Sequence, residues 1–265
     1  MPFRLVPVAD VEPLLRLRGV CKSFGGIQAV HSITFDVGPG ESVGLVGPNG
    51  AGKTTLFNCV CGQLRPEEGD IVFDGRPLSG LPTYKRARMG IGRTYQRVEV
   101  FTDMSVRDHL MVAERSRQGE GRLWRDLLNL SNPKPEELER IDATLELVGI
   151  SHLADTSVNA LGLGHCRLVE LARALATEPK ILLADEPSSG LDLHETAEVA
   201  VVLRTVQRER GTAVLLVEHD LAMVAEVVDR AVVMDLGAML FAGTFDECMA
   251  DPAVRDAYLG QMGLA

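Results

Sequence analysis

The chain has 265 residues, of which 46% are hydrophobic and 24% charged, and its formal net charge is −10. That length can bury one large core, or one core with an attached subdomain. Nucleic acid is not expected as a partner, because binding along a phosphate backbone requires a basic face. The five cysteines are scattered, which predicts reduced core thiols and neither a metal cage nor a disulfide framework.

The sequence gives no signal for a membrane-spanning segment. The longest apolar runs, such as 199–203 and 213–217, are far shorter than the ~20 residues that cross a bilayer. Residues 1–15 contain three prolines and no continuous apolar stretch of the kind that a signal peptide carries. We therefore predict a cytoplasmic protein.

Strand patterns come first in chain order. Ile33, Phe35 and Val37 alternate with polar residues, which predicts a half-buried antiparallel strand, and 70–74 predicts a second one. These strands would form a small β-layer. Short apolar runs predict buried strands of a largely parallel sheet at 42–46, 181–184 and 212–217. Strands separated by helices are typical of the α/β class.

Helix patterns dominate the middle of the chain, where the strand signal nearly vanishes. They lie at 105–117, 135–148 and 166–177, and they predict an inserted helical subdomain. The segment 118–135 has glycines and prolines around Trp124, which indicates a mobile hairpin or a short helix. Near the C-terminus, the pattern predicts a turn at Gly237, a short strand to Ala242 and a helical tail that ends near Gly260.

A glycine-rich loop follows the predicted strand 42–46 and precedes a helical pattern at 55–61. This is the strand, loop and helix context of the phosphate-binding pattern G-x-x-x-x-G-K-[ST]. Backbone N–H groups would surround phosphate oxygens, Lys53 would reach the β- and γ-phosphates, and Thr54 would bind Mg²⁺. The predicted nucleotide-binding residues of this loop are Gly47, Pro48, Asn49, Gly50, Ala51, Gly52, Lys53, Thr54 and Thr55.

Two carboxylates follow the apolar run 181–184. Asp185 and Glu186 would lie at the carboxyl end of a buried strand, where open α/β sheets bind ligands. Asp185 would hold the Mg²⁺, and Glu186 would orient and polarise the water that attacks the phosphate. A strand that ends in Asp-Glu is by itself more often a solvated turn, but the phosphate loop favours the catalytic interpretation.

Further elements occur in the order and spacing of ATP-binding cassette (ABC) ATPases, which the chain resembles over 14–260. Gln96 matches the Q-loop glutamine, which implies contact with the metal and the attacking water. His219 matches the switch histidine at the γ-phosphate, and Asp192 matches the D-loop that crosses a dimer interface. Without the resemblance, these three residues would be a surface amide, a structural histidine and a helix cap.

The resemblance also assigns an adenine site. Phe24 matches the aromatic residue that stacks on adenine, and Val30 would line the same purine pocket. An isolated phenylalanine at this position would more often belong to the core.

Within the family, the chain is most similar to ATPase subunits of branched-chain amino acid uptake systems, the Liv type. Residues 24–30, 93–96 with 101–106, and 251–260 carry this likeness. Urea and lipopolysaccharide systems share much of the pattern and remain alternatives. The resemblance implies ATP and Mg²⁺ as cofactors and a place on the inner face of the cell membrane. It implies three kinds of partner: integral membrane permease subunits, a second ABC ATPase subunit in a homodimer or heterodimer, and an extracytoplasmic substrate-binding protein.

The combined prediction is an α/β fold: a P-loop NTPase (RecA-like) core with a mixed sheet, an N-terminal antiparallel β-layer and an inserted α-helical subdomain. An N-terminal tail over 1–13 would precede a single ABC ATPase domain over 14–260. The predicted divisions are a core at 14–96 and 178–243, a helical subdomain at about 97–177 and a C-terminal helical tail at 244–265.

The family's signature loop, usually Leu-Ser-Gly-Gly-Gln, reads Leu-Gly-Leu-Gly-His at 161–165. In the family this loop faces the γ-phosphate bound by the opposite subunit, so Gly162 and Gly164 are expected to contact nucleotide there. Gly162 keeps a backbone donor and lacks the serine hydroxyl, which predicts one weakened site in an asymmetric heterodimer. The alternative is that backbone donors suffice and the replacement is neutral.

The implied mechanism is ATP held between two head-to-tail cassettes, in-line water attack on the γ-phosphate, and movement of the permease. The segment after Gln96, including Arg97, Val98 and Phe101, would receive a short permease helix or pack within its own subdomain. Two other functions stay open. One is a soluble cassette protein of translation or DNA repair, although such proteins usually carry two cassettes or a long coiled coil. The other is a regulatory subunit that binds ATP and hardly hydrolyses it.

Overall fold

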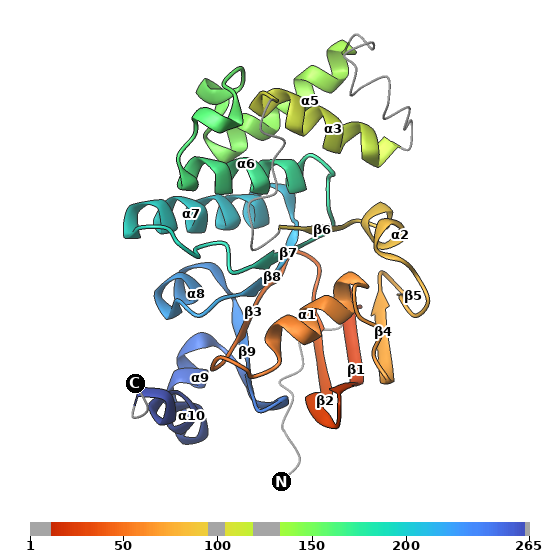
Figure 1. Cartoon of the computed structure of the whole chain (residues 1–265), viewed down its shortest axis with the longest axis vertical. Coiled ribbons are helices and arrows are strands. Elements are labelled where there is room, and N and C mark those ends of the chain that lie inside the picture. The colour runs from red at the N-terminus through yellow and green to blue at the C-terminus, as the bar shows by residue number, and fades with distance from the viewer. Residues whose placement is uncertain (1–11, 95–103, 119–132, 263–265) are drawn as a thin grey trace.

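The computed structural model describes residues 12–94, 104–118 and 133–262 (Figure 1). A six-stranded sheet has the order β10-β9-β3-β8-β7-β6, and a four-stranded sheet has the order β2-β1-β4-β5. The large sheet is parallel except for β10, which runs antiparallel to β9. The small sheet is antiparallel throughout. The predicted α/β class, with a mixed sheet and an antiparallel N-terminal layer, is therefore confirmed.

The elements have the following bounds. The large sheet comprises β3 (Ser42–Val46), β6 (Ile91–Arg93), β7 (Ile181–Asp185), β8 (Ala213–Val217), β9 (Arg230–Asp235) and β10 (Ala238–Gly243). The small sheet comprises β1 (Leu15–Phe24), β2 (Ile27–Val37), β4 (Glu68–Phe73) and β5 (Arg76–Pro77). The described helices are α1 (Lys53–Cys61), α2 (Thr83–Arg88), α3 (Val106–Gln118), α5 (Pro135–Val148), α6 (Leu163–Leu175), α7 (Leu193–Arg210), α8 (Leu221–Val227), α9 (Phe245–Ala250) and α10 (Pro252–Met262). Two short 3-10 turns lie at Ser151–Leu153 and Val158–Ala160.

The large sheet is buried on both faces because successive residues of each strand point to opposite sides. In β7, Leu182 and Ala184 pack with the cluster that includes α3, α5, α6 and α7. Ile181 and Leu183 pack on the other side, with α1 and the small sheet. This two-sided burial explains why the parallel strands read as apolar runs instead of alternating patterns. None of the described helices combines the length and hydropathy that crossing a bilayer requires.

Most predicted segments lie within a few residues of the observed elements, whereas β1, β6, β9, α2 and α8 had no predicted counterpart. β2 begins at Ile27, well before the predicted alternation at Ile33. The bounds of α6 also differ from the prediction. The helix begins at Leu163, three residues before the predicted start, and ends at Leu175 instead of Thr177. Gly162 is its N-cap, with φ −70° and ψ 169° and no side-chain cap hydrogen bond. A glycine gives no capping signal of the Ser, Thr, Asp or Asn type, so the sequence pattern missed the first turn.

The cysteines are free thiols, and four of the five are buried. Burial raises the pKa of Cys59 and Cys248 to about 11 and that of Cys61 to about 12. These thiols therefore stay protonated at neutral pH, as expected of core thiols. Cys166 is only partly buried and is the exception to the prediction.

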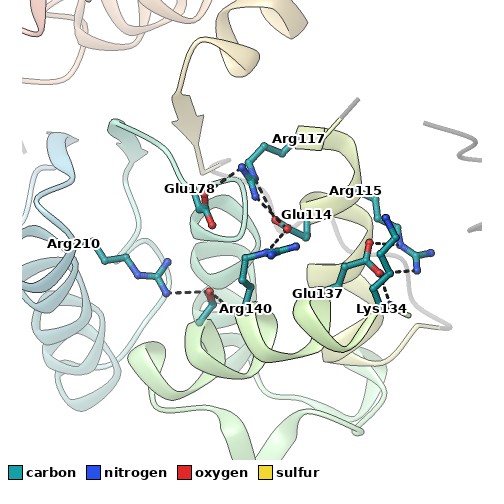
Figure 2. Close-up of polar contacts among 9 residues, drawn as sticks. Glu114, Arg115, Arg117, Lys134, Glu137, Arg140, Glu178 and Arg210 are labelled. Carbon is teal, nitrogen blue, oxygen red and sulfur yellow. Dashed lines mark hydrogen bonds and ion pairs between the residues drawn. The ribbon is translucent and has the colours of Figure 1, made fainter. Parts of the chain in front are cut away.

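The helices α3, α5 and α6 form a helical layer over one face of the large sheet. Polar contacts join these helices to one another and to the rest of the protein (Figure 2). Glu114 of α3 is 2% exposed and pairs with Arg140 of α5 at 2.6 Å and with Arg117 at 3.2 Å. Arg117 also reaches Glu178, in the segment that returns from α6 to the core, at 3.2 Å. At the end of α7, Arg210 donates to the Thr144 hydroxyl at 3.1 Å. Charged contacts therefore reinforce the hydrophobic packing of this layer.

Arg86 has an unusual position for an arginine, because it is 5% exposed and donates only to backbone carbonyls among its described contacts. Its guanidinium bonds the carbonyls of Cys59 and Val60, at the end of α1, at 2.8 Å. It also bonds the carbonyls of Leu78 and Leu81 at 2.9 Å. The side chain thus closes the C-terminal end of the helix that follows the glycine-rich loop.

Replacing Arg86 with methionine is expected to lower the free energy of unfolding by about 2–4 kcal/mol, because buried carbonyls lose charged donors. Urea denaturation measures the change. Arg88→Met is the matched control, since Arg88 is exposed and its contact among the described residues is with the Tyr84 ring, 5.8 Å from the ring centroid. Its expected effect is within about 0.5 kcal/mol. Equal small losses for both variants would contradict this role of Arg86.

Candidate functional site

The predicted phosphate loop connects β3 to α1, and two of its glycines are required by close backbone contacts. A Cβ at Gly47 (φ 144°) would lie 2.0 Å from the carbonyl oxygen of Met234. One at Gly52 (φ 95°) would lie 2.1 Å from the carbonyl oxygen of Ala29. Only glycine fits at these positions, because the loop packs tightly against β9 and β2. Gly50 has open space around it.

Lys53 lies inside the loop. It is 6% exposed, and its Nζ donates to the carbonyl oxygens of Gly47 at 2.5 Å and Pro48 at 2.9 Å. Burial lowers the pKa of Lys53, and the nearby Glu186 carboxylate opposes this shift. The ammonium is thus held by loop carbonyls beside the predicted catalytic glutamate.

The other loop residues differ in exposure. Asn49 and Gly50 are exposed at the turn, whereas Pro48 and Ala51 are buried. Thr54 is exposed and Thr55 partly buried in the first turn of α1, whose N-terminal N–H groups are suited to an anion.

The acidic pair lies where β7 ends, as predicted. Asp185 is 3% exposed, and its Oδ2 is 3.4 Å from an amino group of Arg93. Burial raises the pKa of Asp185, Arg93 opposes the rise, and the Glu186 and Glu218 charges add to it. Glu186 has φ +47°, and its backbone N–H donates to the Val217 carbonyl at 2.8 Å. A left-handed backbone at a glutamate needs support from its surroundings.

Arg93 had no separate predicted role. The guanidinium lies between Asp185 and the ring of Phe57, whose centroid is 4.8 Å away. An arginine in a short apolar run was the sequence signal that could have pointed to such a role. A guanidinium that is buried in a strand requires a charged or polar partner. The strand register, which pairs Arg93 with Leu183, determined that this partner is Asp185.

The residues after β8 lie next to the acidic pair, because β7 and β8 end at the same edge of the large sheet. His219 has an exposed side chain, at 58%, and its Nδ1 is 3.5 Å from the Glu218 carboxylate. Glu218 is fully buried and also contacts Ser188, near the acidic pair. Its position between an apolar strand and a histidine gave no sequence signal for a role of its own.

The remaining predicted residues lie on other elements. Phe24, at the end of β1, is 47% exposed and has the Lys22 ammonium 5.2 Å from its ring centroid, so it is not a core residue. Val30 has no exposed surface, because it packs in the core with α1 and the small sheet. The prediction that Val30 lines a purine pocket is therefore not supported. Asp192 caps α7 by accepting the N–H of Glu195 at 2.9 Å, as in the helix-cap interpretation.

The signature residues lie at the start of α6. Gly162 is exposed, and a Cβ there would meet nothing within 4 Å. Gly164 is buried, and a Cβ there would lie 2.5 Å from the Glu195 carboxylate. Their nucleotide contacts stay predictions. Gln96, with Arg97, Val98, Phe101 and the segment around Trp124, lies outside the described residues.

The residues present suit a magnesium ion. The Thr54 hydroxyl and the Asp185 carboxylate are hard oxygen donors of the kind that Mg²⁺ prefers. Burial of Asp185 next to the Glu186 carboxylate favours a cation there. Neither residue offers the sulfur or imidazole donors that select zinc or copper.

Comparisons with known proteins agree with this geometry. The ABC transporter family model matches residues 30–189. The high-affinity branched-chain amino acid transport ATP-binding protein LivG of Escherichia coli is 38% identical over 94% of this chain and 99% of that protein. The lipopolysaccharide export system ATP-binding protein LptB of Haemophilus influenzae is 36% identical over 94% of this chain and 98% of that protein.

A solved structure shows the same fold. The ADP conformation of MJ1267, an ATP-binding cassette of an ABC transporter, is 29% identical and covers 94% of this chain and 100% of that one, with a TM-score of 0.81. The chain belongs to the ABC transporter family, as an ATP-binding and ATP-hydrolysing subunit.

Proposed function

We propose that the chain drives an importer of branched-chain amino acids by hydrolysing Mg²⁺-bound ATP at the carboxyl edge of its large sheet. The single observation that supports the catalytic part is the strand register, which brings the loop of Lys53 and the pair Asp185 and Glu186 to one edge of the sheet. The similarity to LivG over nearly the whole chain supports the substrate class.

In this proposal, the chain's own residues bind and orient ATP and the attacking water. Backbone N–H groups of 47–55 and the Lys53 ammonium hold the β- and γ-phosphates. Thr54, Asp185 and Gln96 would hold Mg²⁺, and the ion would supply positive charge to the phosphate oxygens. Glu186 orients the water and accepts its proton, and His219 contacts the γ-phosphate.

The adenine and the partner contacts complete the proposal. The exposed ring of Phe24 stacks on adenine. Asp192, Gly162 and Gly164 face a second ABC ATPase subunit, where the start of α6 contributes to the opposite nucleotide site. Permease subunits receive the mechanical work on the inner face of the cell membrane, and an extracytoplasmic substrate-binding protein delivers the amino acid. The domain divisions predicted from the sequence belong to the same proposal.

A transport assay tests the substrate class. Deleting the gene in the source cells is expected to abolish uptake of radiolabelled leucine, because the permease loses its ATPase. The wild-type gene should restore uptake, and Glu186→Gln should not. The similarity to LptB supports lipopolysaccharide export as the second candidate. Intact leucine uptake together with lost surface lipopolysaccharide would favour that candidate and contradict import.

The site proposal predicts a split between binding and hydrolysis. Lys53→Ala is expected to weaken ATP binding roughly 100-fold, because a charge-assisted contact to phosphate is lost. Glu186→Gln is expected to keep the Kd for ATP within about threefold and to lower kcat roughly 100-fold or more. Calorimetry and phosphate release measure the two effects. Lys85→Ala, on the exposed surface of α2, is the control for lost positive charge. Unchanged ATP affinity in Lys53→Ala would overturn the site.

The altered signature generates a further prediction. Serine fits at residue 162, because the backbone there is extended and the space around it is open. In the assembled complex, Gly162→Ser is expected to raise turnover roughly ten- to 100-fold at the site that this loop completes, by adding a hydroxyl contact to the γ-phosphate. The other site contains this chain's own Glu186, so Glu186→Gln in this chain blocks it. The turnover that remains is then that of the site completed by residue 162. No gain would favour the alternative, in which backbone donors suffice.

A further inference from the structure

Glu218 is a buried charged residue at the edge of the proposed site, and the proposed chemistry gives it no contact with ATP or Mg²⁺. It follows β8 directly, and its side chain has 0% exposure. Four donors reach its carboxylate: the N–H and hydroxyl of Ser188, the N–H of His219 and the N–H of Asp220. A buried carboxylate is costly unless such donors replace its water, so the surroundings are arranged to keep it in place.

The two carboxylate oxygens serve different segments of the chain. Oε1 accepts from the Ser188 N–H at 2.9 Å and from the Ser188 hydroxyl at 2.5 Å. Oε2 accepts from the N–H groups of His219 at 2.9 Å and Asp220 at 3.3 Å. Ser188 lies two residues after Glu186. One side chain therefore ties the loop after β7 to the loop after β8.

Other contacts show that the Glu186 loop needs such support. The backbone of Glu186 is left-handed, and its N–H is bonded to Val217, the last residue of β8. The Ser189 N–H donates to the Glu186 carbonyl at 3.1 Å, and the Leu191 N–H donates to the Ser188 carbonyl at 3.0 Å. The strained residue is thus held on one side by Val217, and the turn that follows it is held by Glu218.

We propose that Glu218 is a positioning residue for ATP hydrolysis, which fixes the backbone of Glu186 relative to the backbone of His219. The inference rests on the roles proposed above for these two residues. A shift of either group by a fraction of an ångström impairs the alignment of water and γ-phosphate. The phosphate loop and Phe24 bind the nucleotide without Glu218, so the effect falls on kcat and not on binding.

A glutamine at position 218 has one acceptor oxygen in place of two. It can therefore accept the backbone hydrogen bonds of only one of the two loops. If the Gln nitrogen faces His219 and Asp220, their N–H groups lose their acceptor. If it faces Ser188, the hydroxyl can turn to accept from it, but the Ser188 N–H is left without a partner. Glu218→Gln therefore loosens the bridge while keeping the shape and volume of the side chain.

Steady-state kinetics and ATP calorimetry on the full chain, assembled with its partners, test the proposal. Glu218→Gln is expected to lower kcat on the order of tenfold to 100-fold and to leave the Kd for ATP within about threefold. Ser188→Ala keeps the backbone contact and loses the hydroxyl, so a smaller loss of about threefold to tenfold is expected. The double variant should lose less than the product of the single losses, because both changes act on one contact.

Thr212→Val is the matched control. Thr212 precedes the other end of β8, is 4% exposed, and donates to the Pro179 carbonyl at 3.3 Å. The variant removes a buried hydrogen bond of the same strand region, far along the strand from the site, and kcat should stay within about twofold. Urea denaturation of every variant shows whether the folded fraction accounts for a lost rate.

Each outcome has one meaning. A fall in kcat at constant Kd, absent from Thr212→Val and not additive between Glu218 and Ser188, supports the positioning role. Unchanged kcat in Glu218→Gln, a loss equal to that of the control, or a parallel rise in Kd overturns it. If Glu218→Gln does not fold, Ser188→Ala with the control decides on the same criteria. Failure of Glu186→Gln to lower kcat would instead overturn the proposed site itself.

Discussion

The functional arrangement depends on the parallel pairing of β3, β8 and β7 in a sheet that is buried on both faces. The register aligns Leu45 with Val217 and Val217 with Asp185, so the three strands end side by side. Apolar residues fill both faces, and polar groups therefore collect at the strand ends and directly beyond them. Gly47, Glu186 and Glu218 follow these ends directly.

Three charges at this edge, those of Lys53, Asp185 and Glu218, are buried, and each is compensated locally. Lys53 is held by two loop carbonyls, Asp185 faces Arg93, and Glu218 is surrounded by four donors. Unpaired burial of any of them would cost several kcal/mol. These contacts hold each charged group in one position. A fixed arrangement of charges is needed to position a triphosphate and a water molecule for reaction.

The helical layer is attached in a different way. Its helices pack with α7 over one face of the large sheet, while Arg117 and Arg210 contact groups across the junction (Figure 2). The Arg117–Glu178 ion pair is partly exposed and salt-sensitive, so it contributes modestly to stability. The phosphate-binding edge, by contrast, is fixed by backbone register and by buried polar contacts.

Sequence patterns predicted the α/β class, part of the strand and helix positions, the phosphate loop, and the acidic end of β7. Each depends on local information: hydrophobic period, glycine spacing, and residues adjacent in the chain. The start of α6 was missed because a glycine cap carries no side-chain signal. Only the tertiary structure decided that Arg93 faces Asp185, that Val30 is fully buried, and that Glu218 bridges two loops. The physical reason is that these contacts join strands that are neighbours in the sheet but distant in the chain, and strand order and register are not encoded in any single segment.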